Sequence, residues 1–218
     1  MNIVKASELS QTNITALIYG TPGMGKTSLL GKLNGRTLII DVDKGSSVLN
    51  GSENVDVLFL SEDFSEIPEL LKELSKNNPY KNICIDSISE LERAIIARLA
   101  SKNENGIPAL KDYGRVNNSV LNLCRQLRAF QSNIFITAWE KYTDVIAPSG
   151  EKYSRIEPLI RDKNLENICG LCDLIGRLFI DKDNEKRMVW LQAKPNIIAK
   201  DRIFKRTSCS FDDFIPEI

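Results

Sequence analysis

The chain has 218 residues, of which 42% are hydrophobic and 27% charged, as in an ordinary globular protein with one sizeable core. Lysine plus arginine and aspartate plus glutamate number 29 each, so no overall positive charge points to nucleic acid. The sequence has no long apolar run and no export leader, and we therefore expect a cytoplasmic protein without a membrane anchor.

Apolar β-prone runs alternate with amphipathic segments along the first two thirds of the chain. We expect strands at 14–19, 37–43, 55–60, 81–86 and 133–139. We expect helices at 27–33, 65–76, 89–100 and 114–130, with a loop at 101–112. This alternation predicts an α/β protein of three layers, in which helices cover both faces of a mostly parallel sheet.

The last third of the chain reads as two hairpins. One spans 142–156 and turns around Pro148-Ser149-Gly150, and the other spans 178–194 and turns at Asp183-Asn184. We expect their antiparallel strands to extend the edge of the sheet. No repeat or linker interrupts the chain, so residues 1–218 are predicted to form a single domain.

The stretch LIYGTPGMGKTSLL lies between the first expected strand and the first expected helix, and it fits the phosphate-binding pattern G-x-x-x-x-G-K-[ST]. Loop N–H groups and the helix dipole attract phosphate oxygens, so we expect a bound nucleoside triphosphate. Lys26 would reach the β- and γ-phosphates, and the Thr27 hydroxyl would hold Mg²⁺. The expected phosphate-binding residues are Gly20, Thr21, Pro22, Gly23, Met24, Gly25, Lys26, Thr27 and Ser28.

A magnesium site of this kind also needs a carboxylate at the end of a nearby strand. Asp86 ends the apolar run NICID and is predicted to be that second magnesium residue, the Walker-B carboxylate. Its alternative role is that of N-cap for the following helix. The next residue is Ser87, where AAA+ proteins often have a catalytic glutamate, so the catalytic base must come from elsewhere.

The stretch IIDVDKG, at 39–45, resembles the strand end at which RecA-like recombinases carry their water-activating glutamate, in the pattern I-D-x-E-G. Asp43 stands where that family has glutamate, and the resemblance implies that it is the catalytic base. Asp41 is the competing carboxylate, and a structural role in the turn is the alternative for Asp43.

The resemblance extends from about residue 14 to about residue 204 and includes IDSISEL and LCRQLRAFQSNIFITAWE. The family's phosphate-sensing glutamine is missing at the end of the second stretch, so the resemblance leaves Thr137 or Glu140 to act as sensor. The following segment, 141–165, occupies the place of the family's DNA-contacting loop. Its candidate phosphate contacts are Lys141, Lys152, Arg155, Arg161 and Lys163.

Tyr142 and Tyr153 in this segment are available to stack on single-stranded bases, although an ordinary solvated hairpin is the alternative. Further on, the chain resembles the closing hairpin of the recombinases, which delivers cations to the nucleotide of a neighbouring subunit. Lys194, Lys200 and Arg202 are so placed, which implies a homo-oligomer. Ordinary surface cations are the alternative.

The short chain, its P-loop, CDLIGRL at 172–178 and the closing AKPNIIAKDR also resemble phage-encoded nucleotide-binding proteins with a minimal RecA core. This resemblance implies an ATPase that uses ATP and Mg²⁺, binds single-stranded DNA, and anneals or exchanges strands beside a single-strand-binding protein. Two other classes stay open. One is an AAA+-like adaptor such as a replicative helicase loader, and the other is a small-molecule kinase, for which no arginine-rich lid is found.

Overall fold

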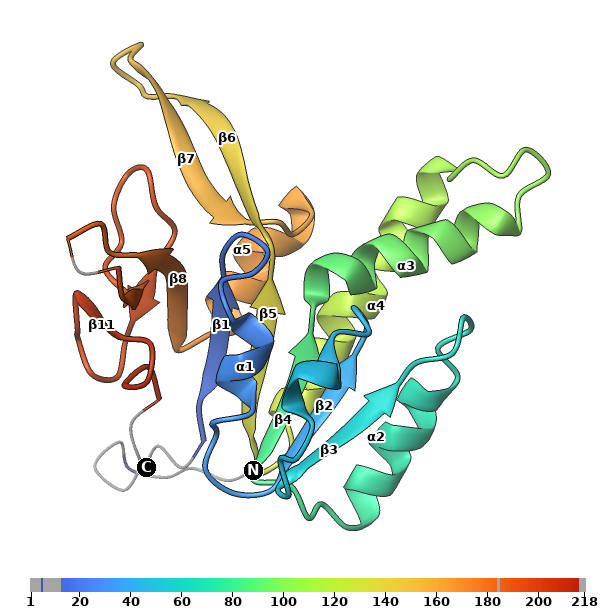
Figure 1. Cartoon of the computed structure of the whole chain (residues 1–218). Coiled ribbons are helices and arrows are strands. Elements are labelled where there is room, and N and C mark those ends of the chain that lie inside the picture. The colour runs from blue at the N-terminus through green and yellow to red at the C-terminus, as the bar shows by residue number, and fades with distance from the viewer. Residues whose placement is uncertain (1–4, 6–12, 184, 216–218) are drawn as a thin grey trace.

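The computed structural model describes residues 5, 13–183 and 185–215, and one twisted sheet dominates it (Figure 1). The strands of this sheet are β1 Thr15–Tyr19, β2 Thr37–Asp41, β3 Val55–Phe59, β4 Asn82–Asp86, β5 Asn133–Ala138, β8 Leu174–Ile180, β9 Arg187–Trp190, β10 Lys200–Asp201 and β11 Ser208–Ser210. The helices are α1 Lys26–Leu30, α2 Glu66–Lys76, α3 Ile88–Ser101, α4 Leu110–Arg128 and α5 Asp162–Leu171, with a 3₁₀ helix, η2, at Ser46–Leu49.

The spatial order of the sheet is β11-β9-β8-β1-β5-β4-β2-β3, and β10 pairs with β8. Strands β3, β2, β4, β5, β1 and β8 run parallel, whereas β9, β10 and β11 are antiparallel to their neighbours. The mostly parallel sheet is therefore confirmed. One strand, β5, stands between β1 and β4, and the carboxyl ends of all three lie at the same edge.

Each face of the sheet carries its own apolar core, which is why the central strands are near-continuous apolar runs. Side chains such as Tyr19 and Ile85 pack with α2, α3, α4 and α5 on one face. Residues such as Ile18 and Phe135 pack on the other face with α1, η2 and the C-terminal Phe214. The three-layer prediction is confirmed, although helices provide only part of the second covering layer.

The helix α1 ends at Leu30, earlier than predicted. Gly31 follows it and packs closely against the Leu49 side chain. A β-carbon at position 31 would lie only 2.6 Å from that side chain, so the position has no room for a larger residue. Short α1 therefore sums few peptide dipoles, and less of the predicted dipole attraction for phosphate is available at its N-terminus.

The first C-terminal hairpin does not extend the sheet, contrary to prediction. Strands β6 Glu140–Ile146 and β7 Lys152–Pro158 form a separate two-stranded sheet that projects from the molecule (Figure 1). We call it the arm. It leaves the sheet at β5, where β1 and β4 already occupy both sides, so β6 has no edge to join.

The second hairpin does extend the sheet, through β8 and β9, as predicted. Of its expected turn, Asn184 lies outside the described residues. Helix α5 begins within the segment 141–165 expected to be a DNA-contacting loop and extends beyond it, and no helix was predicted there. Within the described ranges, no helix is long and apolar enough to cross a bilayer.

Candidate nucleotide-binding site

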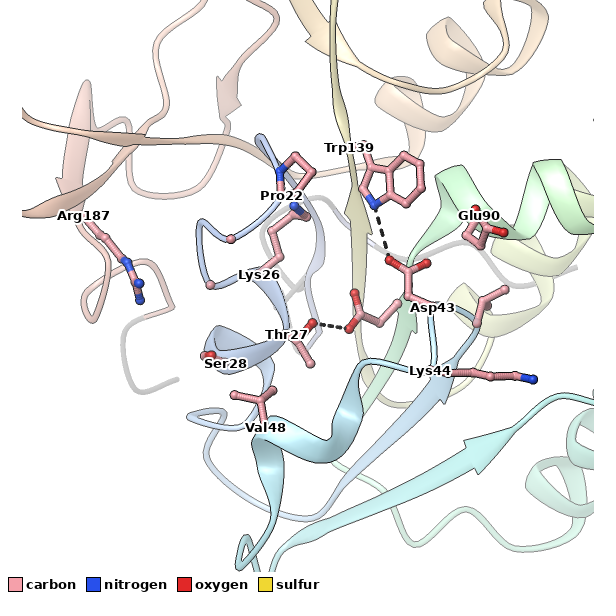
Figure 2. Close-up of a pocket in the computed structure, with 14 residues that line it drawn as sticks. Pro22, Lys26, Thr27, Ser28, Asp43, Lys44, Val48, Glu90, Trp139 and Arg187 are labelled. Carbon is pink, nitrogen blue, oxygen red and sulfur yellow. Dashed lines mark hydrogen bonds between the residues drawn. The ribbon is translucent and has the colours of Figure 1, made fainter.

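A cavity of about 770 Å³ opens at the carboxyl edge of the sheet, over β1, β2, β4 and β5 (Figure 2). Its volume falls within the range of small-molecule and cofactor sites. The lining residues are Pro22, Gly23, Gly25, Lys26, Thr27, Ser28, Val42, Asp43, Lys44, Val48, Asp86, Glu90, Trp139 and Arg187. The sequence thus predicted the P-loop part of this pocket and both carboxylates Asp43 and Asp86. Three of the nine predicted phosphate-binding residues, Gly20, Thr21 and Met24, are not among the lining residues.

The P-loop places Lys26 over the carbonyl groups of its own first residues. The ammonium group donates to Gly20 O at 2.9 Å and to Thr21 O at 3.0 Å. Gly23 and Gly25 adopt φ values of 81° and 90°, which favour glycine. Burial lowers the pKa of Lys26, while the Asp86 carboxylate acts in the opposite direction. Met24 is not among the lining residues and instead packs on the apolar core that contains α1.

The hydroxyl of Thr27 and the carboxylate of Asp86 meet beside this lysine. Thr27 Oγ1 donates to Asp86 Oδ2 at 2.7 Å, and the Thr137 hydroxyl donates to the other carboxylate oxygen. Asp86 is only 1% exposed, and this burial raises its pKa, whereas the two hydroxyl groups act to lower it. Ser87, and not Asp86, is the N-cap of α3.

These groups fit a magnesium ion, because a carboxylate and a hydroxyl within one hydrogen bond of each other supply hard oxygen ligands. The described residues hold no cluster of three or more His, Cys, Asp or Glu side chains able to bind a metal by themselves. Mg²⁺ in nucleotide sites commonly takes one or two protein ligands and completes its shell with phosphate oxygens and water. The predicted pair Thr27 and Asp86 matches that requirement.

The two aspartates at the carboxyl end of β2 have different roles, Asp41 as the last residue of the strand and Asp43 in the loop beyond it. Asp41, the competing base, is 1% exposed and accepts from Gly45 N at 3.2 Å and Ser46 N at 3.0 Å, so it fixes the turn and does not line the pocket. Asp43 lines the pocket and accepts from the Ser87 hydroxyl at 2.9 Å. It also accepts from the indole N–H of Trp139 at 3.3 Å (Figure 2).

The residues suggested as phosphate sensors do not reach the pocket. The Glu140 side chain is 1% exposed and forms an ion pair with Arg177 at 2.8 Å, outside the lining residues. The ion pair with Arg177 of β8 therefore engages Glu140 away from the pocket, and the structure gives no support to its predicted catalytic role. Thr137 is buried and donates to Asp86, so it supports the magnesium carboxylate from behind.

Trp139, Glu90 and Arg187 also line the pocket, and none of them was among the predicted site residues. Trp139 follows directly after β5, so an aromatic residue at a strand's carboxyl end was the available signal. Arg187 comes from β9, which follows the P-loop by more than a hundred residues in sequence. Its guanidinium lies beside Gly25, where an added β-carbon would be 3.0 Å from Nη1.

None of the three cations expected to act on a neighbouring subunit lines the pocket of its own chain. Lys200 donates to the carbonyl groups of Cys169 and Cys172 at the end of α5. Its ammonium group is therefore engaged within its own chain. Arg202 pairs with Asp173 at 3.5 Å.

Lys194, the third of these cations, is exposed and lies 4.0 Å from the centre of the Trp190 ring. A cation above an indole face still carries its full charge and remains open to solvent. Of the three, Lys194 is therefore the one least engaged by carboxylates or carbonyls of its own chain.

Two of the five cations predicted to contact DNA pair with carboxylates within the arm and at its base. Lys141 pairs with Glu157 at 3.3 Å and Asp162 at 2.9 Å. Arg155 pairs with the same Glu157 at 2.7 Å. The two carboxylates Glu157 and Asp162 together balance the charges of Lys141 and Arg155, which weakens the attraction of these cations for a phosphate backbone.

The remaining three predicted DNA contacts differ from one another. Arg161 donates to Asn117 Oδ1 at 3.1 Å and lies over the Tyr113 ring. Lys152, in the arm, and Lys163, in α5, are exposed, and no carboxylate pairs with either of them in the described part of the chain. Only these two retain the character that the sequence predicted.

A lysine-bearing loop between a parallel strand and a helix, with a carboxylate from a strand two places away in the sheet, defines a P-loop NTPase. Residues 12–203 match the family described as "AAA domain", and the chain belongs to this family. It is therefore a nucleotide-binding ATPase domain.

Among solved structures, the chain is similar to the KaiC-like protein PH0186 from the hyperthermophilic archaeon Pyrococcus horikoshii OT3. The identity is 14% and the TM-score 0.44, over 84% of this chain and 79% of the other. The search of curated proteins found no match.

Proposed function

We propose that the protein hydrolyses ATP with Mg²⁺ in the P-loop pocket and uses this hydrolysis on single-stranded DNA, in phage recombination or strand annealing. The observation that carries the first part is the Thr27–Asp86 hydrogen bond of 2.7 Å beside the ammonium group of Lys26. It brings together the three side chains that a magnesium-bound triphosphate requires.

Four side chains of the pocket and the N–H groups of the P-loop take part in this reaction. Loop N–H groups and Lys26 bind the β- and γ-phosphates and stabilise the charge that develops during transfer. Thr27 and Asp86 hold Mg²⁺, which supplies further charge neutralisation when bound. Asp43 orients the attacking water and accepts its proton, as the resemblance to the recombinases implies.

The position of the arm supports a link between the pocket and DNA. The arm begins at Glu140, one residue after Trp139, which lines the pocket. Tyr142 on the arm is 61% exposed and is available to stack on a base, and Lys152 is available to a phosphate. We further propose a homo-oligomer, acting in the cytoplasm of the host cell beside a single-strand-binding protein.

One observation favours a second candidate, an adaptor that binds a protein partner such as a replicative helicase. Glu157 and Asp162 neutralise arm cations, while the apolar Ile146 is 66% exposed on the arm. Against it, α5 is the only α-helix in the described part of the chain after residue 140, whereas an AAA+ adaptor calls for a helical second domain.

Steady-state ATP hydrolysis with and without a single-stranded oligonucleotide separates these candidates. We expect hydrolysis that depends on Mg²⁺, disappears in Lys26→Ala, and rises severalfold with the oligonucleotide. Lys32→Ala, which changes an exposed lysine paired with Asp212, is the matched control and should hydrolyse ATP normally. A rate of ATP hydrolysis that does not change with the oligonucleotide, together with no salt-sensitive DNA binding, would favour the adaptor.

A further inference from the structure

We propose that Trp139 is a positioning residue of the hydrolysis site, whose indole N–H orients the Asp43 carboxylate toward the attacking water. The inference rests on the proposed ATPase function and adds a residue to it. Trp139 is assigned no contact with the nucleotide, because its role is exerted through Asp43.

Asp43 needs such support because packing does not fix it. The strand β2 ends at Asp41, so Asp43 stands in the loop beyond it, where it is exposed. An exposed aspartate samples several rotamers, and only some of them direct an oxygen into the pocket. Orientation must therefore come from hydrogen bonds.

Two residues donate hydrogen bonds to the Asp43 carboxylate, and each donates to a different oxygen. Ser87 donates to Oδ1 through its hydroxyl at 2.9 Å and its backbone N–H at 3.3 Å. The Trp139 indole donates to Oδ2 at 3.3 Å. Donors on both oxygens fix the plane of the carboxylate, whereas Ser87 alone would leave the second oxygen free to rotate away.

The indole itself is held on its ring and on its backbone. The guanidinium of Arg93, from α3, lies 4.5 Å from the centre of the indole ring. Trp139 N donates to Ser89 Oγ at 2.9 Å, and Trp139 O accepts from Leu159 N at 2.6 Å. A donor fixed by α3 and by the end of the arm can orient a mobile carboxylate.

The chain contains one other tryptophan, which provides a matched control. The Trp190 ring packs edge-on against Phe179, with ring centres 6.5 Å apart, and its N–H donates to Gln192 O. Trp190 does not line the nucleotide pocket. Its replacement by phenylalanine removes the same indole without altering Asp43.

The test compares the steady-state kinetics of Trp139→Phe and Trp190→Phe with those of the wild type. Phenylalanine keeps a ring for Arg93 but has no N–H, so we expect kcat of Trp139→Phe to fall about tenfold. KM for ATP should stay within about twofold, because nucleotide contacts are unchanged. Trp190→Phe should match the wild type in both parameters.

A double-mutant cycle with Asp43→Asn identifies the pathway. If Trp139 acts through Asp43, then Trp139→Phe should cause no further loss in the Asp43→Asn background. Trp139→His, measured at pH 8, restores a ring N–H donor and should retain more activity than Trp139→Phe. This comparison remains informative if loss of the indole destabilises both variants. Thermal melting of each variant reports on its folding.

Three outcomes would overturn the inference. They are an unchanged kcat in Trp139→Phe, a loss that adds fully to that of Asp43→Asn, and equal losses in the phenylalanine and histidine variants. A wild type without Lys26-dependent hydrolysis would instead refute the proposed function, and this inference with it. The Lys26→Ala comparison thus distinguishes the two failures.

Discussion

The hydroxyl of Thr27 lies 2.7 Å from the carboxylate of Asp86, although 59 positions separate the two residues in sequence. The contact arises because the P-loop connects the carboxyl end of β1 to α1, and because β4 ends at the same edge of the sheet. It makes the magnesium part of the proposed site directly testable.

Removal of the Thr27 hydroxyl group should impair catalysis more than removal of the Thr27 methyl group. Thr27→Val keeps the shape but deletes a magnesium ligand, and we expect kcat for ATP to fall by about 10². Thr27→Ser retains the hydroxyl and should stay within about threefold of the wild type. Hydrolysis measured across a Mg²⁺ titration checks this, and equal activity of the two variants would refute the assignment of Thr27.

Arg187 is expected to contribute to nucleotide binding rather than to the chemical step. It lies across Lys26 and Thr27 from Asp43, so it is distant from the carboxylate that activates water (Figure 2). We expect Arg187→Ala to raise KM for ATP roughly three- to tenfold with little change in kcat, because a contact made equally in both states affects only binding.

Arg36→Ala is the matched control for Arg187, since Arg36 pairs with Asp56 at 2.9 Å and does not line the pocket. Its KM should equal that of the wild type. Initial rates over a range of ATP concentrations provide both parameters. A fall in kcat of Arg187→Ala at unchanged KM would contradict the binding role.

The proposed DNA contact can be tested at the two unpaired lysines. The double variant Lys152→Gln and Lys163→Gln removes two cations, so the slope of log K against log salt should decrease by about 1.4 for single-stranded DNA. Fluorescence anisotropy of a labelled oligonucleotide at several salt concentrations measures this slope. Lys72→Gln, which changes an exposed residue of α2, should leave it unaltered.

Asp201 should make the stability of the fold depend on pH. Burial by itself would raise its pKa, but Arg206 and the backbone N–H of Phe204, both at 2.7 Å, lower the pKa below its usual value. A carboxylate with a lowered pKa in the folded state stabilises above its unfolded pKa, about 3.9, and this contribution disappears as pH falls through the folded pKa.

We therefore expect Asp201→Asn to reduce the free energy of unfolding by about 1–3 kcal/mol at pH 7. The difference from the wild type should shrink below about pH 3.9. Urea unfolding at several pH values measures it. Asp212→Asn, at an exposed partner of Lys32, should cost less than about 0.5 kcal/mol and show no such trend.

The strand–loop–helix unit of the P-loop and its chemistry could be predicted from the sequence alone. The glycines of the P-loop, Lys26 and Thr27 lie within a few residues of one another in the sequence. Apolar runs such as NICID form the buried strands of the sheet. Local geometry and burial are properties of short segments, and so the P-loop, the parallel strands and Asp86 could all be predicted.

Which distant side chains share a site depends instead on the folded arrangement of the chain. It placed Trp139 and Arg187 in the pocket and paired Glu140 with Arg177. It also used Lys200 to bind carbonyl groups at the end of α5. A charge or an aromatic ring has the same sequence signature in a pocket, an ion pair or a helix cap, because its role depends on which groups the fold brings within a few ångströms.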